Sequence, residues 1–195
     1  MTRSLSDDRP DDPADRTESD GDAVADAEPP TVTGGAAADD PGRIKVGVGE
    51  LAVTTDDAVL TTSGLGSCVA VALVDERAGV RGLLHAMLPT GEGRPTAASR
   101  PAKYVDTGVD TLIGALDDAG ADPRRLEARV AGGAEMLDLT DAVGPRNVER
   151  VGEVLDSVGV PIVASDVGDT VGRTVRFDPD GRLVIRAADG FERAI

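Results

Sequence analysis

The chain has 195 residues, which is enough for one ordinary domain plus a tail, and its formal net charge of −16 excludes a nucleic-acid binder built on basic patches. A single cysteine excludes an internal disulfide, and no apolar stretch reaches the length of a transmembrane helix. We therefore expect a cytoplasmic protein that is not embedded in a membrane.

The basic residues are two lysines and eighteen arginines, and most of the acids are aspartates. Such an acidic, lysine-poor surface is typical of a salt-rich cytoplasm, such as that of a halophilic archaeon, where ionic strength screens self-repulsion. The alternative is one acidic tail on an ordinary domain. Residues 1–42 carry twelve acids and three bases, or −9, which leaves −7 for the remaining residues.

Residues 1–42 are rich in Asp, Ala, Pro, Gly, Ser and Thr and contain no aromatic residue. Such a segment cannot bury enough apolar surface to offset its ordering entropy. We expect a disordered acidic tail at 1–42, with an acidic docking arm as the functional alternative, followed by one domain at 43–195.

Alternating and β-branched apolar residues predict four strands in the first part of the domain. They are residues 44–53, 58–62, 69–74 and 80–87. The five residues 75–79 have the length of a hairpin loop and end in glycine, so the third and fourth strands should pair. A loop rich in Gly, Pro, Ser and Thr is predicted at 91–101.

Two amphipathic helices and further strands are predicted in the second part. Residues 104–119 and 145–158 carry apolar stripes at helical spacing, with Pro145 in the first turn of the second helix. Strands are predicted at 126–131, 162–165, 174–177 and 183–186. This order predicts an α+β or mixed α/β fold rather than a repeated βαβ barrel.

Cys68 and His85 are the only thiol and the only imidazole of the chain. These are the two side chains needed for thiolate attack on a carbonyl. If the hairpin loop is centred between Glu76 and Arg77, paired positions sum to 153 and Cys68 lies opposite His85. A centre at Arg77 gives a sum of 154, and a slip of one residue puts the pair on opposite faces. The sequence permits the contact without proving it.

The stretch before Cys68, residues 62–68 (TSGLGSC), predicts a tight glycine turn. Glycines there let a substrate approach the main chain closely. Backbone N–H groups of such a turn, those of Gly66 and Ser67 here, can form an oxyanion hole. A thiol at this turn beside an imidazolium would have a lowered pKa.

Other interpretations of these residues stay open at this point. A buried free cysteine and a hydrogen-bonded core histidine are the structural alternative. A zinc site would need two further carboxylate ligands, so we expect no metal and no cofactor. The glycine pattern at 47–52 fits a loose dinucleotide fingerprint, but it lies in strand-like sequence and opens no helix.

Six separate blocks carry a resemblance to a known family. They are residues 62–71 (TSGLGSCVAV), 82–89 (GLLHAMLP), 103–107 (KYVDT), 131–134 (AGGA), 144–148 (GPRNV) and 166–173 (DVGDTVGR). In this order they resemble the CheD family, the chemoreceptor glutamine deamidases. The resemblance spans about residues 43–186 and leaves the tail outside. Ser63 stands where the family usually has Leu.

The resemblance implies that Cys68 is the nucleophile and His85 the general acid and base. It implies Thr62 as the third member of the site, which would orient His85, although a serine or a main-chain carbonyl could do this instead. The implied fold is α+β, with mixed β-sheets packed face to face and flanking helices, similar to the catalytic domains of deamidating bacterial toxins.

The implied reaction converts glutamine side chains of methyl-accepting chemotaxis receptors to glutamate and ammonia. A CheC-type phosphatase is implied as a partner, with Gly132, Gly133 and Met136 as candidate contacts. The rival function is a non-catalytic adaptor that regulates this phosphatase, and the intact pair of Cys68 and His85 favours the enzyme. A cysteine peptidase or a transglutaminase-like transferase is a further alternative, which ammonia release without cleavage or cross-linking would exclude.

Overall fold

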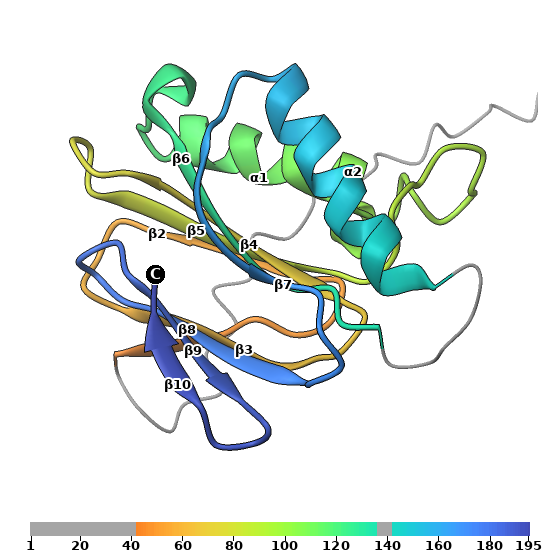
Figure 1. Ribbon diagram of the computed structural model, residues 1–195. Coiled ribbons are helices and arrows are strands. Elements are labelled where there is room, and N and C mark those ends of the chain that lie inside the picture. The colour runs from red at the N-terminus through yellow and green to blue at the C-terminus, as the bar shows by residue number, and fades with distance from the viewer. Residues whose placement is uncertain (1–41, 136–141) are drawn as a thin grey trace, which may run out of the picture.

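The computed structural model describes residues 42–135 and 142–195. Within them, two five-stranded sheets lie face to face, and two α-helices cover the outer face of one sheet (Figure 1). Both sheets mix parallel and antiparallel pairs. The predicted α+β class, with mixed sheets packed together and helices outside, is confirmed. Residues 1–41 of the predicted tail lie outside the described residues.

Sheet A, the sheet without helices, has the order β1-β3-β8-β9-β10. Its strands are β1 (Arg43–Lys45), β3 (Val59–Leu65), β8 (Arg173–Phe177), β9 (Leu183–Ala187) and β10 (Glu192–Ala194). Strand β1 runs parallel to β3, and the other pairs are antiparallel. The short β10 was not predicted from the sequence.

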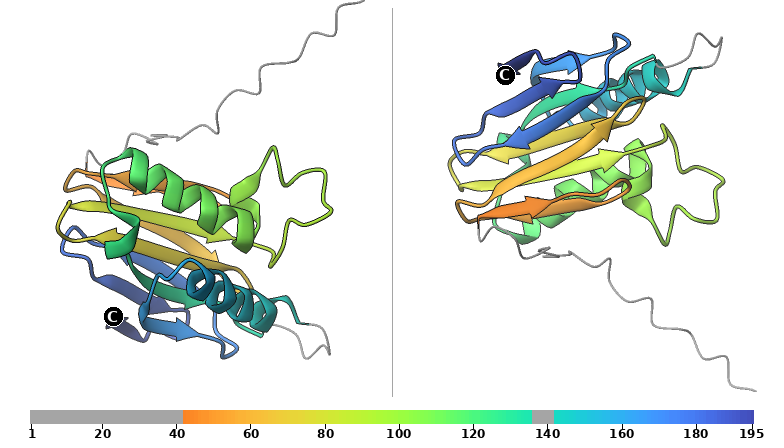
Figure 2. Two further views of the ribbon diagram at one scale, coloured as in Figure 1. Left: turned by 90° about the horizontal axis from the view of Figure 1, so that it is seen from above. Right: turned by 90° about the horizontal axis from the view of Figure 1, so that it is seen from below.

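Sheet B has the order β2-β5-β4-β6-β7. Its strands are β2 (Leu51–Thr54), β5 (Val80–Ala86), β4 (Val69–Asp75), β6 (Glu127–Gly132) and β7 (Ile162–Val167). All seven residues of β4 and all seven of β5 are buried. Helices cover one face of these strands and sheet A covers the other (Figure 2), which explains why their sequences are almost continuously apolar.

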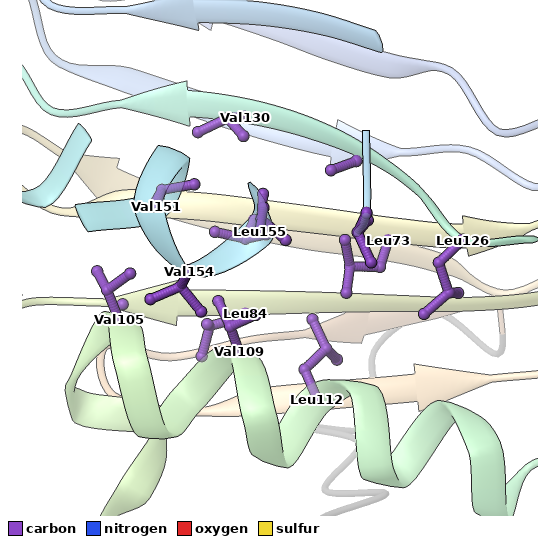
Figure 3. Close-up of a cluster of buried hydrophobic side chains, with 14 of the residues drawn as sticks. Leu73, Leu84, Val105, Val109, Leu112, Leu126, Val130, Val151, Val154 and Leu155 are labelled. Carbon is purple, nitrogen blue, oxygen red and sulfur yellow. The ribbon is translucent and has the colours of Figure 1, made fainter. Parts of the chain in front are cut away.

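The helices α1 (Val105–Asp118) and α2 (Val143–Ser157) were predicted within two residues at each end. Short 3₁₀ turns, η1 (Pro101–Lys103) and η2 (Pro123–Arg125), precede α1 and β6. The apolar stripes of both helices meet sheet B in one buried cluster (Figure 3). It includes Leu73, Leu84, Val109, Leu112, Val151 and Leu155. This cluster fixes the helices against the outer face of sheet B.

A second cluster fills the space between the two sheets. Sheet A contributes large side chains to it, such as Leu60 and Phe177, and sheet B contributes Leu83 and several small ones, among them Ala70, Ala72 and Ala131. Large residues facing small ones let the layers pack closely without voids. The same interlayer space holds the polar residues of the candidate site.

The single strand predicted at 44–53 is wrong, because the chain changes sheets inside it. Residues 43–45 belong to sheet A and residues 51–54 to sheet B. The change is made by a turn in which Glu50 N–H donates to Gly47 O over 3.2 Å and Gly49 has φ of 74°. Positive φ strongly favours glycine, and the strand-like pattern of valines on either side concealed this turn.

The register of the β4–β5 hairpin also differs from both expectations. Asp75 pairs with Val80 and Ala70 with His85, so paired positions sum to 155 rather than 153 or 154. Asp75 is therefore the last residue of a strand, not the first residue of the loop. Its carboxylate accepts hydrogen bonds from the main-chain N–H groups of Arg77 and Ala78 and closes a shorter turn.

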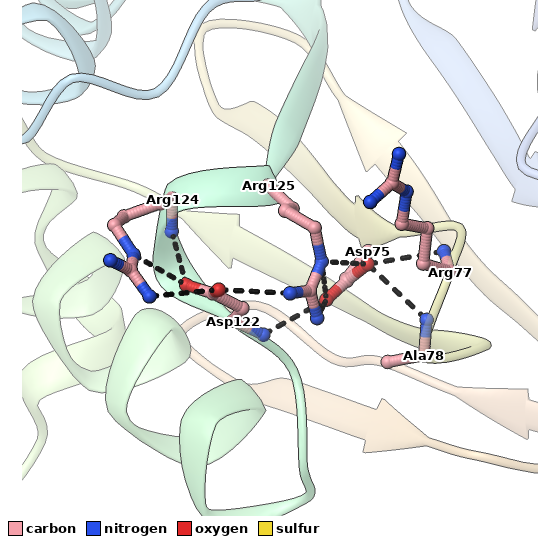
Figure 4. A network of polar contacts seen from close by, with 6 residues as sticks. All are labelled: Asp75, Arg77, Ala78, Asp122, Arg124 and Arg125. Carbon is pink, nitrogen blue, oxygen red and sulfur yellow. Dashed lines mark hydrogen bonds and ion pairs between the residues drawn. The ribbon is translucent and has the colours of Figure 1, made fainter.

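Asp75 is fully buried and joins the hairpin to the segment before β6 (Figure 4). It accepts from the guanidinium of Arg125 at 2.6 Å and from the N–H of Asp122 at 2.9 Å. The Arg125 hydrogen bond holds the pKa of Asp75 well below its usual range. The buried charge is thus compensated, which the burial of a carboxylate requires.

Replacing Asp75 with Asn should lower the free energy of unfolding by about 1–3 kcal/mol, because charged hydrogen bonds are lost. A carboxyl with a lowered folded-state pKa stabilises the fold fully above its ordinary pKa of about 4, and this contribution is lost as the pH falls through the lowered value. In urea titrations, the difference between wild type and Asp75→Asn should be constant from about pH 6 to 8 and shrink below about pH 4. A difference that does not change down to pH 3 would contradict this assignment.

Candidate active site

Thr62 lies on β3 and points into the space between the sheets. Leu60 and Thr62 alternate with outward-facing neighbours, and Thr62 is 2% exposed. Directly after Thr62 the pairing of β3 with β8 shifts, which marks a β-bulge before Leu65. Bulges are frequent beside active sites, because they redirect the chain and the side chains near them. Here the bulge ends the regular strand and begins the glycine turn that leads to Cys68.

His85 lies on β5, fully buried, with its side chain directed toward sheet A. Both main-chain polar groups of His85 are hydrogen-bonded to the turn at 47–50. Gly49 N–H donates to His85 O, and His85 N–H donates to Glu50 O. This turn contains the glycines of the pattern at 47–52 that loosely fits a dinucleotide fingerprint. No helix follows it, as the sequence predicted.

The hydrogen bonds of Thr62 determine the tautomer of His85. The hydroxyl donates to Val46 O over 2.7 Å, and its oxygen lies 2.7 Å from Nδ1 of His85. A hydroxyl has one proton, which Val46 O takes, so the oxygen must accept from Nδ1–H. The proton of the neutral ring is therefore on Nδ1, and Nε2 is free to accept another. Among the described residues, nothing is bonded to Nε2.

Cys68 lies on the same side of sheet B as His85. Because Ala70 is directly opposite His85, Cys68, two residues before Ala70, is a diagonal neighbour of His85. Diagonal neighbours are roughly 7–8 Å apart at the backbone, within reach of longer side chains. Cys68 packs against the interlayer cluster and is partly exposed. In the described residues no hydrogen bond joins its sulfur to Nε2, and catalytic contacts often tighten only when substrate binds.

The expected lowering of the thiol pKa is wrong. Burial raises the pKa of Cys68 above its ordinary value, an effect only partly offset by its own main-chain N–H. Burial also lowers the pKa of His85 to about 4, because a dry site disfavours the imidazolium. At neutral pH the pair is therefore a neutral thiol beside a neutral imidazole. His85 is in the form that can accept a proton.

One of the two predicted oxyanion donors in the turn before Cys68 is free. Gly64 has φ of 78°, and the N–H of Gly66 donates to Gly64 O over 3.0 Å, so this N–H is used inside the turn. The N–H of Ser67 has no acceptor among the described residues. Of the two predicted oxyanion donors, Ser67 is therefore available for a ligand, whereas Gly66 shapes the turn.

Gly132 and Gly133 hold the main chain of Cys68. Both are buried, and the N–H of Gly133 donates to Cys68 O over 2.7 Å. A Cβ on Gly132 would lie 2.4 Å from the same oxygen, so only glycine permits this approach. Their contacts in the structure are internal. Met136, the third candidate for partner contact, lies outside the described residues.

Asn147 was not singled out from the sequence as a site residue. It is fully buried on α2, and its amide donates to Ser67 O and Met87 O, next to the nucleophile turn and the end of β5. The one signal available was its place in the block at 144–148. Within the described residues, no group of three or more His, Cys, Asp or Glu side chains could hold a metal ion.

Comparisons with known proteins show the family to which the chain belongs. A family profile described as CheD chemotactic sensory transduction matches residues 87–187. A "Probable chemoreceptor glutamine deamidase CheD" of Haloarcula marismortui is 45% identical over 153 residues, which cover 76% of this chain and 87% of that protein.

The chain belongs to the CheD family.

Two further relatives carry the name "Chemoreceptor glutamine deamidase CheD". The protein of Thermotoga maritima is 41% identical over 150 residues, covering 76% of this chain and 94% of its own. That of Halalkalibacterium halodurans is 40% identical over 158 residues, covering 78% and 98%. Within residues 42–135 and 142–195 of this CheD protein, no helix is long and apolar enough to cross a membrane.

The tautomer and protonation of His85 can be tested directly, because it is the only histidine. In a ¹⁵N-edited NMR titration we expect a protonated Nδ1 and an unprotonated Nε2 from pH 8 to about pH 5. Burial lowers the pKa to about 4, so the ring should stay neutral in this range and gain its second proton only in more acidic solution. A ring that titrates near pH 6.5 would contradict the effect of burial, and a neutral ring protonated at Nε2 would contradict the hydrogen bond to Thr62.

Proposed function

We propose that this CheD protein is a chemoreceptor glutamine deamidase in which Cys68 is the nucleophile, His85 the acid and base, and Thr62 the residue that orients His85. One observation carries the proposal: the hydroxyl oxygen of Thr62 accepts a hydrogen bond from Nδ1–H of His85, which leaves Nε2 of the neutral ring free on the face it shares with Cys68. The names of the relatives supply the reaction and the substrate class.

The first half-reaction forms a thioester. As the sulfur of Cys68 attacks the amide carbon of the glutamine side chain, Nε2 of His85 accepts the thiol proton. The carbonyl oxygen becomes an oxyanion, and the free N–H of Ser67, directly before Cys68, is the proposed donor to it. The imidazolium then gives its proton to the leaving nitrogen, and the carbon–nitrogen bond breaks to release ammonia.

The second half-reaction regenerates the thiol. Nε2, neutral again, accepts a proton from water, and the hydroxide adds to the thioester carbon. The carbon–sulfur bond breaks, the proton returns to sulfur, and glutamate leaves. The sum is glutamine plus water giving glutamate plus ammonia. The charge on His85 exists only between these steps, which suits a buried ring whose charged form is disfavoured.

The product changes the charge of the receptor. A neutral amide becomes a carboxylate, which repels neighbouring acids and can be neutralised again by methylation. The enzyme itself carries a net charge of −16, so its approach to an acidic receptor is opposed at low salt and eased when salt screens both surfaces. We therefore assign it to a salt-rich cytoplasm, as its acidic and lysine-poor composition predicts.

Further parts of the proposal rest on the family resemblance alone. A CheC-type phosphatase is the proposed partner, and the sandwich of two sheets is proposed to share its fold with the catalytic domains of deamidating toxins. A non-catalytic adaptor is the less favoured function, because an adaptor does not need the hydrogen bond between Thr62 and His85. Release of ammonia without peptide cleavage or cross-linking would exclude a peptidase and a transferase.

Cys68→Ala should abolish conversion of receptor glutamine to glutamate, because no other thiol is present. The measurement incubates receptor with wild type or variant in high salt and counts Gln-to-Glu conversions by mass spectrometry. The same digests report any cleaved or cross-linked peptides. Equal conversion by the two proteins would eliminate Cys68 as the nucleophile.

Thr62→Val should reduce kcat by about 10- to 100-fold, because the isosteric side chain cannot accept a hydrogen bond from Nδ1–H and the ring loses its fixed orientation. Thr61→Val is the matched control. Thr61 is the adjacent residue of the same strand, so its half-buried side chain points to the outer face of sheet A, away from His85. Comparable losses in both variants would show that the threonines act only through the stability of β3.

A further inference from the structure

Asn147 is hydrogen-bonded to two main-chain segments, one before β4 and one after β5, that the sheet does not join. Its Nδ2 lies 2.8 Å from Ser67 O and 3.1 Å from Met87 O, and both are hydrogen bonds. Ser67 directly precedes the nucleophile, and Met87 is two residues after His85. One amide group is therefore bonded to the chain on both sides of the proposed reaction centre.

The β4–β5 ladder ends just before these residues. Its last pair is Val69 with Ala86, so Ser67 and Met87 lie beyond the regular main-chain hydrogen bonds. Beyond that pair, the N–H of Met87 turns away to donate to Lys103 O. The amide of Asn147 links the segments at Ser67 and Met87 where main-chain hydrogen bonds between them end. It sets how far the nucleophile turn can separate from the strand that carries the imidazole.

The chemistry of the two partners admits only one orientation of the side chain. Both are carbonyl oxygens, which accept and cannot donate, so the NH₂ group of Asn147 must face them. Its Oδ1 is buried without a partner among the described residues. A buried polar group with an unpaired oxygen is costly, and Asn is a poor helix former, so packing alone does not account for this residue.

The helix that carries Asn147 is held in place at the same end. A Cβ on Gly144 would lie 2.3 Å from Ala134 O, and a Cβ on Gly133 would lie 2.3 Å from the side chain of Val148. The first turns of α2 therefore rest directly on the chain beyond β6. Gly133 is itself bonded to Cys68 O. Asn147 is therefore carried by a helix end that is packed closely against the chain segment bonded to Cys68.

We infer that Asn147 is a positioning residue that fixes the Cys68 turn against the His85 strand, so that sulfur and Nε2 meet when a glutamine side chain enters. Its amide is bonded to main-chain oxygens and not to the reacting atoms of Cys68 and His85. This inference rests on the proposed function for its turnover measurement. Its second measurement, the alkylation of Cys68, needs no receptor.

Asn147→Asp is the sharpest variant, because it keeps the shape and removes both donated hydrogen bonds. The matched control is Asp75→Asn, an isosteric change at another fully buried polar residue, at the opposite end of β4. For each protein, kcat and KM are measured on receptor at a temperature where circular dichroism shows the variant to be folded. The rate of Cys68 alkylation by iodoacetamide is measured from pH 5 to 10.

We expect Asn147→Asp to lower kcat by about 10- to 100-fold with KM changed less than about threefold, since a displacement on the order of 1 Å has such an effect on an oriented reaction. Its alkylation rate should also lose the dependence on pH that His85 gives the wild type. Asp75→Asn should keep the wild-type kcat and alkylation profile and change only the unfolding midpoint.

A wild-type kcat and alkylation profile in folded Asn147→Asp would overturn the inference. Should this variant fail to fold, Asn147→Ser, which keeps one donor without adding charge, is measured in the same way and should show a smaller loss of the same kind. If wild type alkylates as expected but converts no receptor glutamine, the proposed function fails while the positioning role is still decided by the alkylation profiles.

Discussion

The hydrogen bond between Thr62 and His85 crosses from one sheet to the other, and the proposed chemistry depends on it. An imidazole buried between two β-sheets must pair its N–H, since an unpaired buried donor costs about 1–3 kcal/mol. Val46 O takes the only proton of Thr62, so the ring has to donate through Nδ1. The pairing that makes burial tolerable is the same pairing that leaves Nε2 free. The hydrogen bond between Thr62 and His85 therefore both satisfies the buried ring and prepares it to accept a proton.

Burial of the site determines its electrostatics. Sheet A covers the inner face of β5, which disfavours charge on both His85 and Cys68 and leaves the pair neutral at rest. A neutral pair needs proton transfer in step with attack, so small errors in spacing matter more than for a preformed ion pair. This requirement explains why the nucleophile turn is held so firmly, by Gly133 on one side and by Asn147 on the other.

Local patterns in the sequence predicted most of the fold, and the errors came from contacts that such patterns do not contain. The helices and most strands were found because apolar spacing reports which face is buried. The hairpin register was missed because Asp75 closes the turn with its side chain and counts as a strand residue. The raised pKa of Cys68 depends on layers distant in sequence. Asn147 escaped notice because its partners lie 80 and 60 residues away.

The central claim is that the imidazole of His85 accepts the thiol proton of Cys68. The most direct test is the rate of Cys68 alkylation by iodoacetamide, measured in wild type and His85→Ala as a function of pH. The single cysteine makes the labelled site unambiguous. We predict that wild type reacts about tenfold faster or more at pH 6–7, where the thiol needs a base, and that the difference closes at high pH, where the thiol ionises unaided. Identical profiles in the two proteins would place the ring out of reach of the sulfur and contradict the account.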